Sequence, residues 1–201
     1  MSRPSQSNDY LHTCLALHGK VSLQVFGQLQ DLKKVEATTR TIRSSRHLTY
    51  EDIESIKNQE LWNGAHFWRW PSREEIETDL ESEKWDLWNL PRNKNHALET
   101  LLRLFRHIEP TSVVLRFVDP SNYGILSPPV EKLLELGPSR SRRAKYLQYV
   151  QTLRSIRDRR GFRSAAEVDM ALWVLQVGVL EKKVDGHQDL AGQFHADKEL
   201  R

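Results

Sequence analysis

The chain has very little cysteine and no long apolar run. Its single cysteine, Cys14, excludes an internal disulfide and is typical of a reducing compartment. No apolar run approaches the roughly 18 residues that a membrane-spanning helix needs. The first residues, MSRPSQSND, lack the apolar centre of a secretory signal. We therefore expect a cytoplasmic protein with no membrane partner.

The sequence also lacks the motifs that bind common cofactors. It contains no glycine-rich phosphate loop, no nucleophile elbow and no kinase signature. Its eight histidines show no metal-ligand spacing, and one cysteine is too few for the usual zinc sites. We expect neither a metal nor a cofactor.

The composition is polar but sufficient for a core. Of 201 residues 38% are apolar, and six Trp, six Phe and five Tyr can supply buried surface. The length fits one domain or two small ones. No stretch alternates as a strand would, whereas apolar residues recur at helical spacing, so the expected fold is an all-α multi-helix bundle.

Local signals divide this bundle into segments. We expect residues 1–9 to be disordered, 10–48 to form N-terminal helices that end in a polar, basic connector from residue 37, and 49–178 to form a helical domain. Residues 179–201 read as a polar tail in which Val179, Leu180 and Phe194 can dock. Capping pairs predict three helix starts, at Thr49 with Asp52, Ser72 with Glu75 and Ser164 with Glu167. A long helix is predicted over 141–160, closed by Gly161.

The central region has its own pattern of helices and breaks. Apolar residues predict a helix over 98–108, an interruption at Glu109 and Pro110, and another helix over 111–118. Asp119 and the residues after it, PSNYG, are typical of a turn, in which we expect the aspartate side chain to bond its own backbone. Ser127 is expected to cap a further helix that has Pro128 at its first position and runs to Leu136.

This helix, hairpin, helix, loop and helix arrangement resembles the centre of the helix-hairpin-helix DNA glycosylases, in particular the branch with the 8-oxoguanine glycosylase fold. The family hairpin, roughly LPGVGPKTA, aligns with FRHIEPTSV at 105–113, and the family's PVDTHV aligns with ILSPPV at 125–130. The resemblance covers roughly residues 95–177. It implies a DNA-binding fold of the same kind.

The positions that carry the family's chemistry differ here. The lysine that attacks the sugar falls on Thr111, which has no amine, and the aspartate that stabilises the sugar cation falls on Ser127, which has no charge. The family's hairpin glycines are absent, and Glu109 places a negative charge where a phosphate would approach. The resemblance therefore implies a catalytically inactive homologue. Asp119 and Asp169 are weak candidates for a replacement carboxylate, with a turn role and an ion pair to Arg160 or Arg163 as their simpler interpretations.

Charge is unevenly distributed along the chain. Residues 51–90 hold eleven Asp or Glu and four Lys or Arg, whereas residues 137–163 hold nine Lys or Arg and one acid, Asp158. The basic block can contact phosphate, or it can contact acidic segments of its own chain or of a second copy. The candidate phosphate contacts in it are Arg140, Arg142, Arg143, Lys145, Arg157, Arg159 and Arg160.

Three functions follow from this sequence. The first is a non-catalytic protein that binds DNA or RNA through the basic block. The second is an interaction subunit or adaptor, in which acidic and basic helices pair within a homo-oligomer or with a protein partner. The third, weaker interpretation is an active base-excision enzyme with rearranged carboxylates.

Overall fold

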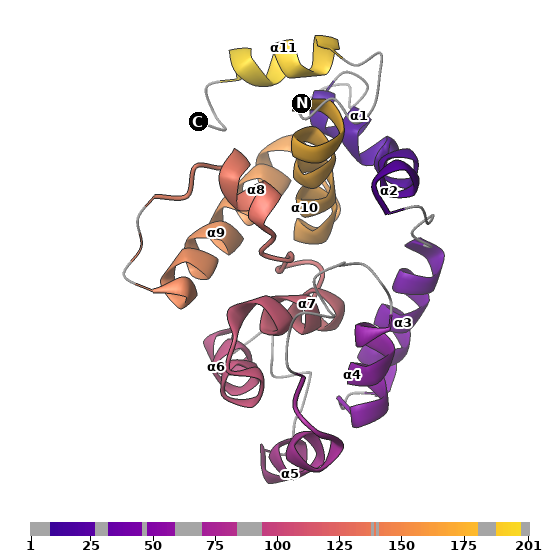
Figure 1. Ribbon diagram of the computed structural model, residues 1–201, viewed down its shortest axis with the longest axis vertical. Helices are drawn as coiled ribbons and strands as arrows, with labels where there is room; N and C mark the ends of the chain where they lie inside the picture. Colours follow the sequence, from indigo (N-terminus) through magenta and orange to yellow (C-terminus); the bar gives the residue numbers. More distant parts are fainter. Residues whose placement is uncertain are drawn as a thin grey trace, which may run out of the picture. The chain divides into compact units, whose positions relative to one another are not determined.

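The computed structural model describes residues 9–26, 32–45, 48–58, 70–83, 94–137, 139, 141–180 and 188–197, and most of these residues lie in helices (Figure 1). No strand occurs among them, and the all-α expectation is confirmed. None of the helices in these ranges is both long and apolar enough to cross a membrane. Disorder is expected for residues 1–9, and of these only Asp9 lies within the described residues.

The chain divides into two compact units. Unit 1 combines residues 1–30 with 126–201, and unit 2 is the continuous stretch 31–125. By sequence, unit 1 carries a net charge of about +5 and unit 2 of about −2. The helical segment expected at 10–48 is thus shared between the units.

The described residues of unit 1 form seven helical elements. They are α1 (Tyr10–Ala16), α2 (His18–Phe26), α8 (Pro128–Leu133), α9 (Arg142–Arg160), α10 (Ala165–Trp173), the π-helix η4 (Val174–Leu180) and α11 (Gln188–Ala196). α10 packs against α1, α8 and α9, while η4 packs against α1, α2, α8 and α11. Where a polar tail was expected, α11 forms and docks because Leu190 and Phe194 are buried.

Where unit 2 is described, it contains the helices α3 (Leu32–Ser45), α4 (Tyr50–Lys57), α5 (Arg73–Glu83), α6 (Lys94–Phe105) and α7 (Ile108–Val118). α7 packs against α3, α4 and α6, and most of its side chains are buried. The expectation of a connector from residue 37 is wrong, because helix α3 continues through this region to Ser45. Ile42, fully buried in α3, supplies packing that outweighs the weak helix propensity of the neighbouring Thr and Ser residues.

The capping signals placed most helix starts correctly. Thr49 and Asp52 exchange both bonds of a capping box, and Ser72 and Glu75 do the same. Ser164 accepts the N–H of Glu167, but the Glu167 carboxylate accepts the N–H of Arg163 and not that of Ser164.

Two expectations about helix boundaries in the centre of the chain are wrong. Glu109 and Pro110 do not interrupt a helix but belong to the first turn of α7, where the missing proline N–H has no helical partner to lose. The preceding helix ends at Phe105 instead of 108, because Arg106 takes a left-handed conformation with φ 58°.

The helix after Ser127 also departs from expectation. Ser127 occupies the N-cap, yet its hydroxyl makes no capping bond. Pro128 and Pro129 follow it, so the donor at the second position that such a hydroxyl often bonds is missing. The helix ends at Leu133, before Leu136, and Glu135 takes a left-handed φ of 45°.

Candidate nucleic-acid interface

The candidate interface lies on α9, the longest helix of unit 1. Ser141 caps its start by accepting the N–H of Ala144 at 3.1 Å, and Gly161 ends it with φ 72°. These local signals fix both ends where the sequence predicted them. The apolar stripe that anchors the helix is fully buried and consists of Tyr146, Tyr149, Val150, Leu153 and Ile156.

Basic side chains are not spread evenly along α9. The outward positions in its middle are neutral, as at Gln148, Gln151 and Ser155, which are all exposed. The cations collect towards the two ends. We call Arg142, Arg143 and Lys145 the basic end, since they occupy the first turns of the helix.

The basic end is positive for two reasons. Arg142 and Arg143 are exposed, and the first turn of α9 contains no carboxylate. The partial positive charge of the helix N-terminus adds to their charge. A negatively charged group would be stabilised by both contributions.

One acidic side chain, Glu131 of α8, is ion-paired with two members of the basic end. Its two carboxylate oxygens accept bonds of 2.6 Å from Arg142 and of 2.6 Å from Lys145. Partial burial favours the neutral acid, but the bonds from Lys145 and Arg142 outweigh it and hold the pKa of Glu131 below its usual value. The three cations of the basic end and the Glu131 carboxylate together carry a net charge of about +2.

The other end of α9 is largely engaged in ion pairs within unit 1. Arg160 bonds Asp9 at 2.8 Å and also pairs with Asp197, and only 16% of its side chain is exposed. Arg157 pairs with the neighbouring Asp158 at 2.8 Å. Arg159 is exposed at the same end. Arg160 therefore ties three segments of unit 1 together and presents little surface to an external phosphate.

The remaining candidate cation, Arg140, lies outside the described residues. The sequence also predicted an ion pair of Asp169 with Arg160 or Arg163. Arg163 pairs with Glu167. The Asp169 carboxylate accepts the hydroxyl of Tyr149 on α9, and Asp169 is only 6% exposed. Burial and the adjacent Asp169 carboxylate raise the pKa of Tyr149 well above its usual value.

The positions aligned with glycosylase chemistry have structural roles. The Thr111 hydroxyl is fully buried and donates to the carbonyls of His107 and Leu101, joining α6 to α7. Asp119 is buried in a turn, where its carbonyl accepts two backbone bonds and its carboxylate accepts the Asn122 amide at 2.7 Å. The turn that the sequence predicted around Asp119 is present, and the carboxylate bond described here goes to the Asn122 side chain. Within the described ranges, no three His, Cys, Asp or Glu side chains gather as metal ligands would.

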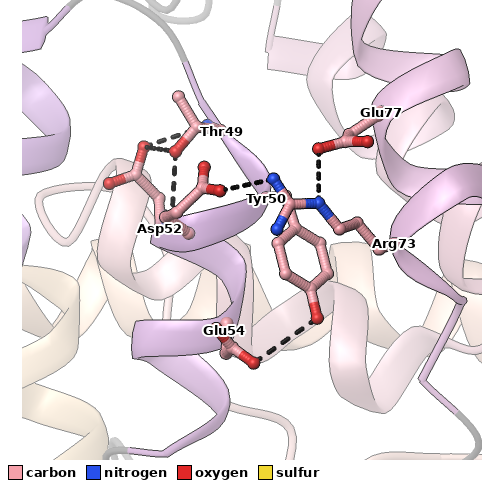
Figure 2. Close-up of polar contacts among 7 residues, drawn as sticks. Thr49, Tyr50, Asp52, Glu54, Arg73 and Glu77 are labelled. Carbon is pink, nitrogen blue, oxygen red and sulfur yellow. Dashed lines mark hydrogen bonds and ion pairs between the residues drawn. The ribbon is translucent and has the colours of Figure 1, made fainter.

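Unit 2 carries the acidic counterpart of the basic end. Glu74, Glu75 and Asp79 of α5 are exposed, and Ile76 anchors the helix from its buried side. Arg73 joins α5 to α4, because its guanidinium bonds Glu51 at 3.0 Å and lies over the Tyr50 ring. The same guanidinium bonds Glu77 within α5 at 2.7 Å (Figure 2).

Sequence reasoning missed the acidic residues that organise the basic block. Asp9 and Asp197 lie far from Arg160 in the sequence, and Glu131 precedes Arg142 by eleven residues in a different helix. No spacing rule links such residues, since tertiary packing alone brings them together. The Tyr10 hydroxyl, which donates to Asp197 at 2.8 Å, was missed for the same reason.

The chain matches no protein-family model, no curated protein and no solved structure.

Proposed function

We propose that this protein binds the phosphate backbone of a nucleic acid through the basic end of α9 and catalyses no reaction on it. The observation that carries the proposal is the exposure of Arg142 and Arg143 in the first turn of a 19-residue helix that has no carboxylate there. Guanidinium groups bind phosphate oxygens in paired hydrogen bonds, and the helix N-terminus favours the same anion. Contacts of this kind hold a backbone without reading its bases.

The proposal includes a scaffold similar to the helix-hairpin-helix glycosylases but without their reaction. Thr111 and Ser127 occupy the family's reacting positions, and the Thr111 hydroxyl is committed to two backbone carbonyls. The cytoplasm is our proposed location. Burial, with a smaller contribution from Asp9, raises the pKa of the single thiol, Cys14, to about 12, so this thiol is protonated and a poor nucleophile at neutral pH.

The direct test is fluorescence anisotropy with labelled single- and double-stranded DNA and RNA at two salt concentrations. Three phosphate contacts on a duplex release enough counterions to weaken binding about 40-fold between roughly 50 and 200 mM salt. The double variant Arg142→Glu with Arg143→Glu should lose this binding. Unchanged affinity of that variant would refute the proposed interface.

A matched control separates the basic end from total charge. Arg43 and Lys57 are exposed on helices of unit 2, so Arg43→Glu with Lys57→Glu alters the net charge by the same amount. We expect that variant to bind like the native protein. An equal loss in both double variants would mean that net charge, and not α9, drives binding.

A gain of binding gives the sharpest version of the test. Glu131→Gln removes the carboxylate that pairs with Arg142 and Lys145 and raises the local net charge by one. We expect tighter and more salt-dependent binding, a result that damage to the fold cannot imitate. Weaker binding by this variant would contradict the proposal.

A second candidate, from a different class, is charge-complementary association with protein. Its support is the exposed acidic surface of α5, in a unit of net charge about −2, against the basic end in a unit of about +5. It predicts a salt-sensitive oligomer in sedimentation velocity that both Arg142→Glu and Glu74→Lys disrupt. A monomer at all salt concentrations would exclude self-association.

A further inference from the structure

Ser141 is an exposed hydroxyl directly before the basic end. It sits in the segment SRSRR at 139–143, so that arginines precede and follow it in the sequence. Its backbone is extended, with φ −159° and ψ 159°, and its oxygen accepts the N–H of Ala144 at 3.1 Å. The hydroxyl therefore lies on an exposed residue just before the first turn of the helix.

We infer that Ser141 is a phosphorylation site for an arginine-directed serine kinase, and that its modification switches off phosphate binding by the basic end. The regulatory half of this inference rests on the proposed function. In the transfer, the Ser141 oxygen attacks the γ-phosphorus of ATP, the bond to the bridging oxygen breaks, ADP leaves and the kinase takes the hydroxyl proton. The product is a phosphoserine at the N-cap of α9.

Three other serines, Ser44, Ser155 and Ser164, also follow an arginine and show why Ser141 is singled out. Ser44 follows Arg43 and is exposed, but it lies inside α3, where its hydroxyl donates to the Thr41 carbonyl at 2.8 Å. Ser155 follows Arg154 and is exposed, but it lies inside α9, where its hydroxyl cannot align with a kinase-bound phosphate without unwinding the helix. Ser164 follows Arg163 and is extended, but it is only partly exposed and Glu167 stands beside it in the same first turn. A phosphate there would meet a carboxylate.

The charge of the modification matches the charge it would cancel. The basic end with Glu131 carries a net charge of about +2. A phosphoserine adds about −1.5 to −2 at neutral pH, which brings the local charge close to zero. Its oxygens would also compete with Glu131 and with an external backbone phosphate for Arg142 and Lys145.

The modification site is tested by labelling the full chain with an arginine-directed serine kinase and ATP, followed by peptide mass spectrometry. We expect phosphate on Ser141 and none on Ser155, and the variant Ser141→Ala should lose the label. A label on Ser155 alone, or no label on Ser141, would overturn the assignment. The native and Ser141→Ala chains are compared by circular dichroism so that loss of the fold is not mistaken for loss of the site.

The switch is tested with chains in which phosphoserine is incorporated directly at position 141 or, as a control of equal charge, at position 155. We expect phosphoserine at 141 to weaken nucleic-acid binding at least about tenfold and to raise Tm by about 1–3 °C, because a dianion is favourable at a helix N-terminus. Phosphoserine at 155 should affect binding less and leave Tm unchanged or lower.

The outcomes separate the two proposals. If the native chain binds and phosphoserine at 141 leaves its affinity unchanged, the switch is overturned and the proposed function stands. If the native chain does not bind at all, the proposed function and the switch both fail, while the labelling result still decides whether Ser141 is a modification site.

Discussion

Gly178 is a position where the close packing of η4 against α2 leaves no room for a side chain. A Cβ atom there would lie 2.8 Å from one methyl carbon of Val21 and 3.2 Å from the other. Val21 is fully buried, so it has little freedom to move away. Gly192 of α11 is different, because a Cβ atom there would meet nothing within 4 Å.

These two glycines predict opposite effects of the same substitution. We expect Gly178→Ala to lower the free energy of unfolding by about 1–3 kcal/mol through overpacking. Gly192→Ala should raise it by about 0.5–1 kcal/mol, since alanine is the better helix former. Urea denaturation measures both. Adding Val21→Ala to Gly178→Ala should restore part of the lost stability, and a Gly178→Ala chain as stable as the native one would contradict the packing argument.

Single residues also show where sequence reasoning stops. Thr49 with Asp52 was predictable because both capping bonds are local. The left-handed φ of Arg106 was not, since a side-chain-bearing residue disfavours that region and only the packing of Phe105 and Ile108 on either side imposes it. The unbonded hydroxyl of Ser127 is an intermediate case, because the two prolines that deprive it of a donor are visible in the sequence.

At the scale of elements, the C-terminal end of α9 offers two arginines in contrasting surroundings. Arg160 is 16% exposed and pairs with Asp9 and Asp197, which come from the start of α1 and from the residue after α11. Arg163 is 84% exposed and pairs with Glu167. Arg160 therefore connects separate elements of unit 1, whereas Arg163 pairs with a residue only four positions along the chain.

Replacing each arginine by methionine should therefore have very different costs. Arg160→Met removes the guanidinium that pairs with Asp9 and Asp197 in a partly buried place, and we expect a loss of roughly 2–3 kcal/mol in the free energy of unfolding, somewhat below that of a fully buried pair. Arg163→Met should cost less, about 0.5–1 kcal/mol, because Glu167, whose side chain is only 11% exposed, keeps its bond from the backbone N–H of residue 163. Equal losses in chemical denaturation would show that burial does not govern these pairs.

The same helix shows how much of the candidate site was predictable. Its bounds, its apolar stripe and the collection of arginines at its ends follow from the sequence, and the structure has them so. The sequence does not show which of the basic residues form ion pairs, because the acidic partners Glu131, Asp9 and Asp197 come from other helices and segments. Helix α3 was missed for a related reason, since packing of Ile42 and not local propensity holds it.

At the scale of the whole molecule, the two units differ in how the chain builds them. Unit 2 is one continuous stretch with its own core, which includes Ile53, Ile76, Leu101 and Phe117. Unit 1 needs two separate stretches, because α1 packs against α10 and places Leu11 and Cys14 in the core.

This connectivity predicts which fragments fold. We expect residues 31–125 to fold alone, with a cooperative thermal transition in circular dichroism. We expect residues 126–201 to remain unfolded until a peptide of residues 1–30 is added. A cooperative transition of 126–201 without that peptide would show that α1 and α2 are dispensable to unit 1.

The contact between α1 and α10 also sets an order of events on the ribosome. About 150 residues separate the two helices, so roughly 7–30 s of synthesis pass between them at usual elongation rates. During that interval the apolar side of α1 has no partner, while the unit between them can already close. Helix α1 thus leaves the ribosome well before α10 can bury it, which makes nascent α1 a place where a chaperone would bind or where aggregation would begin.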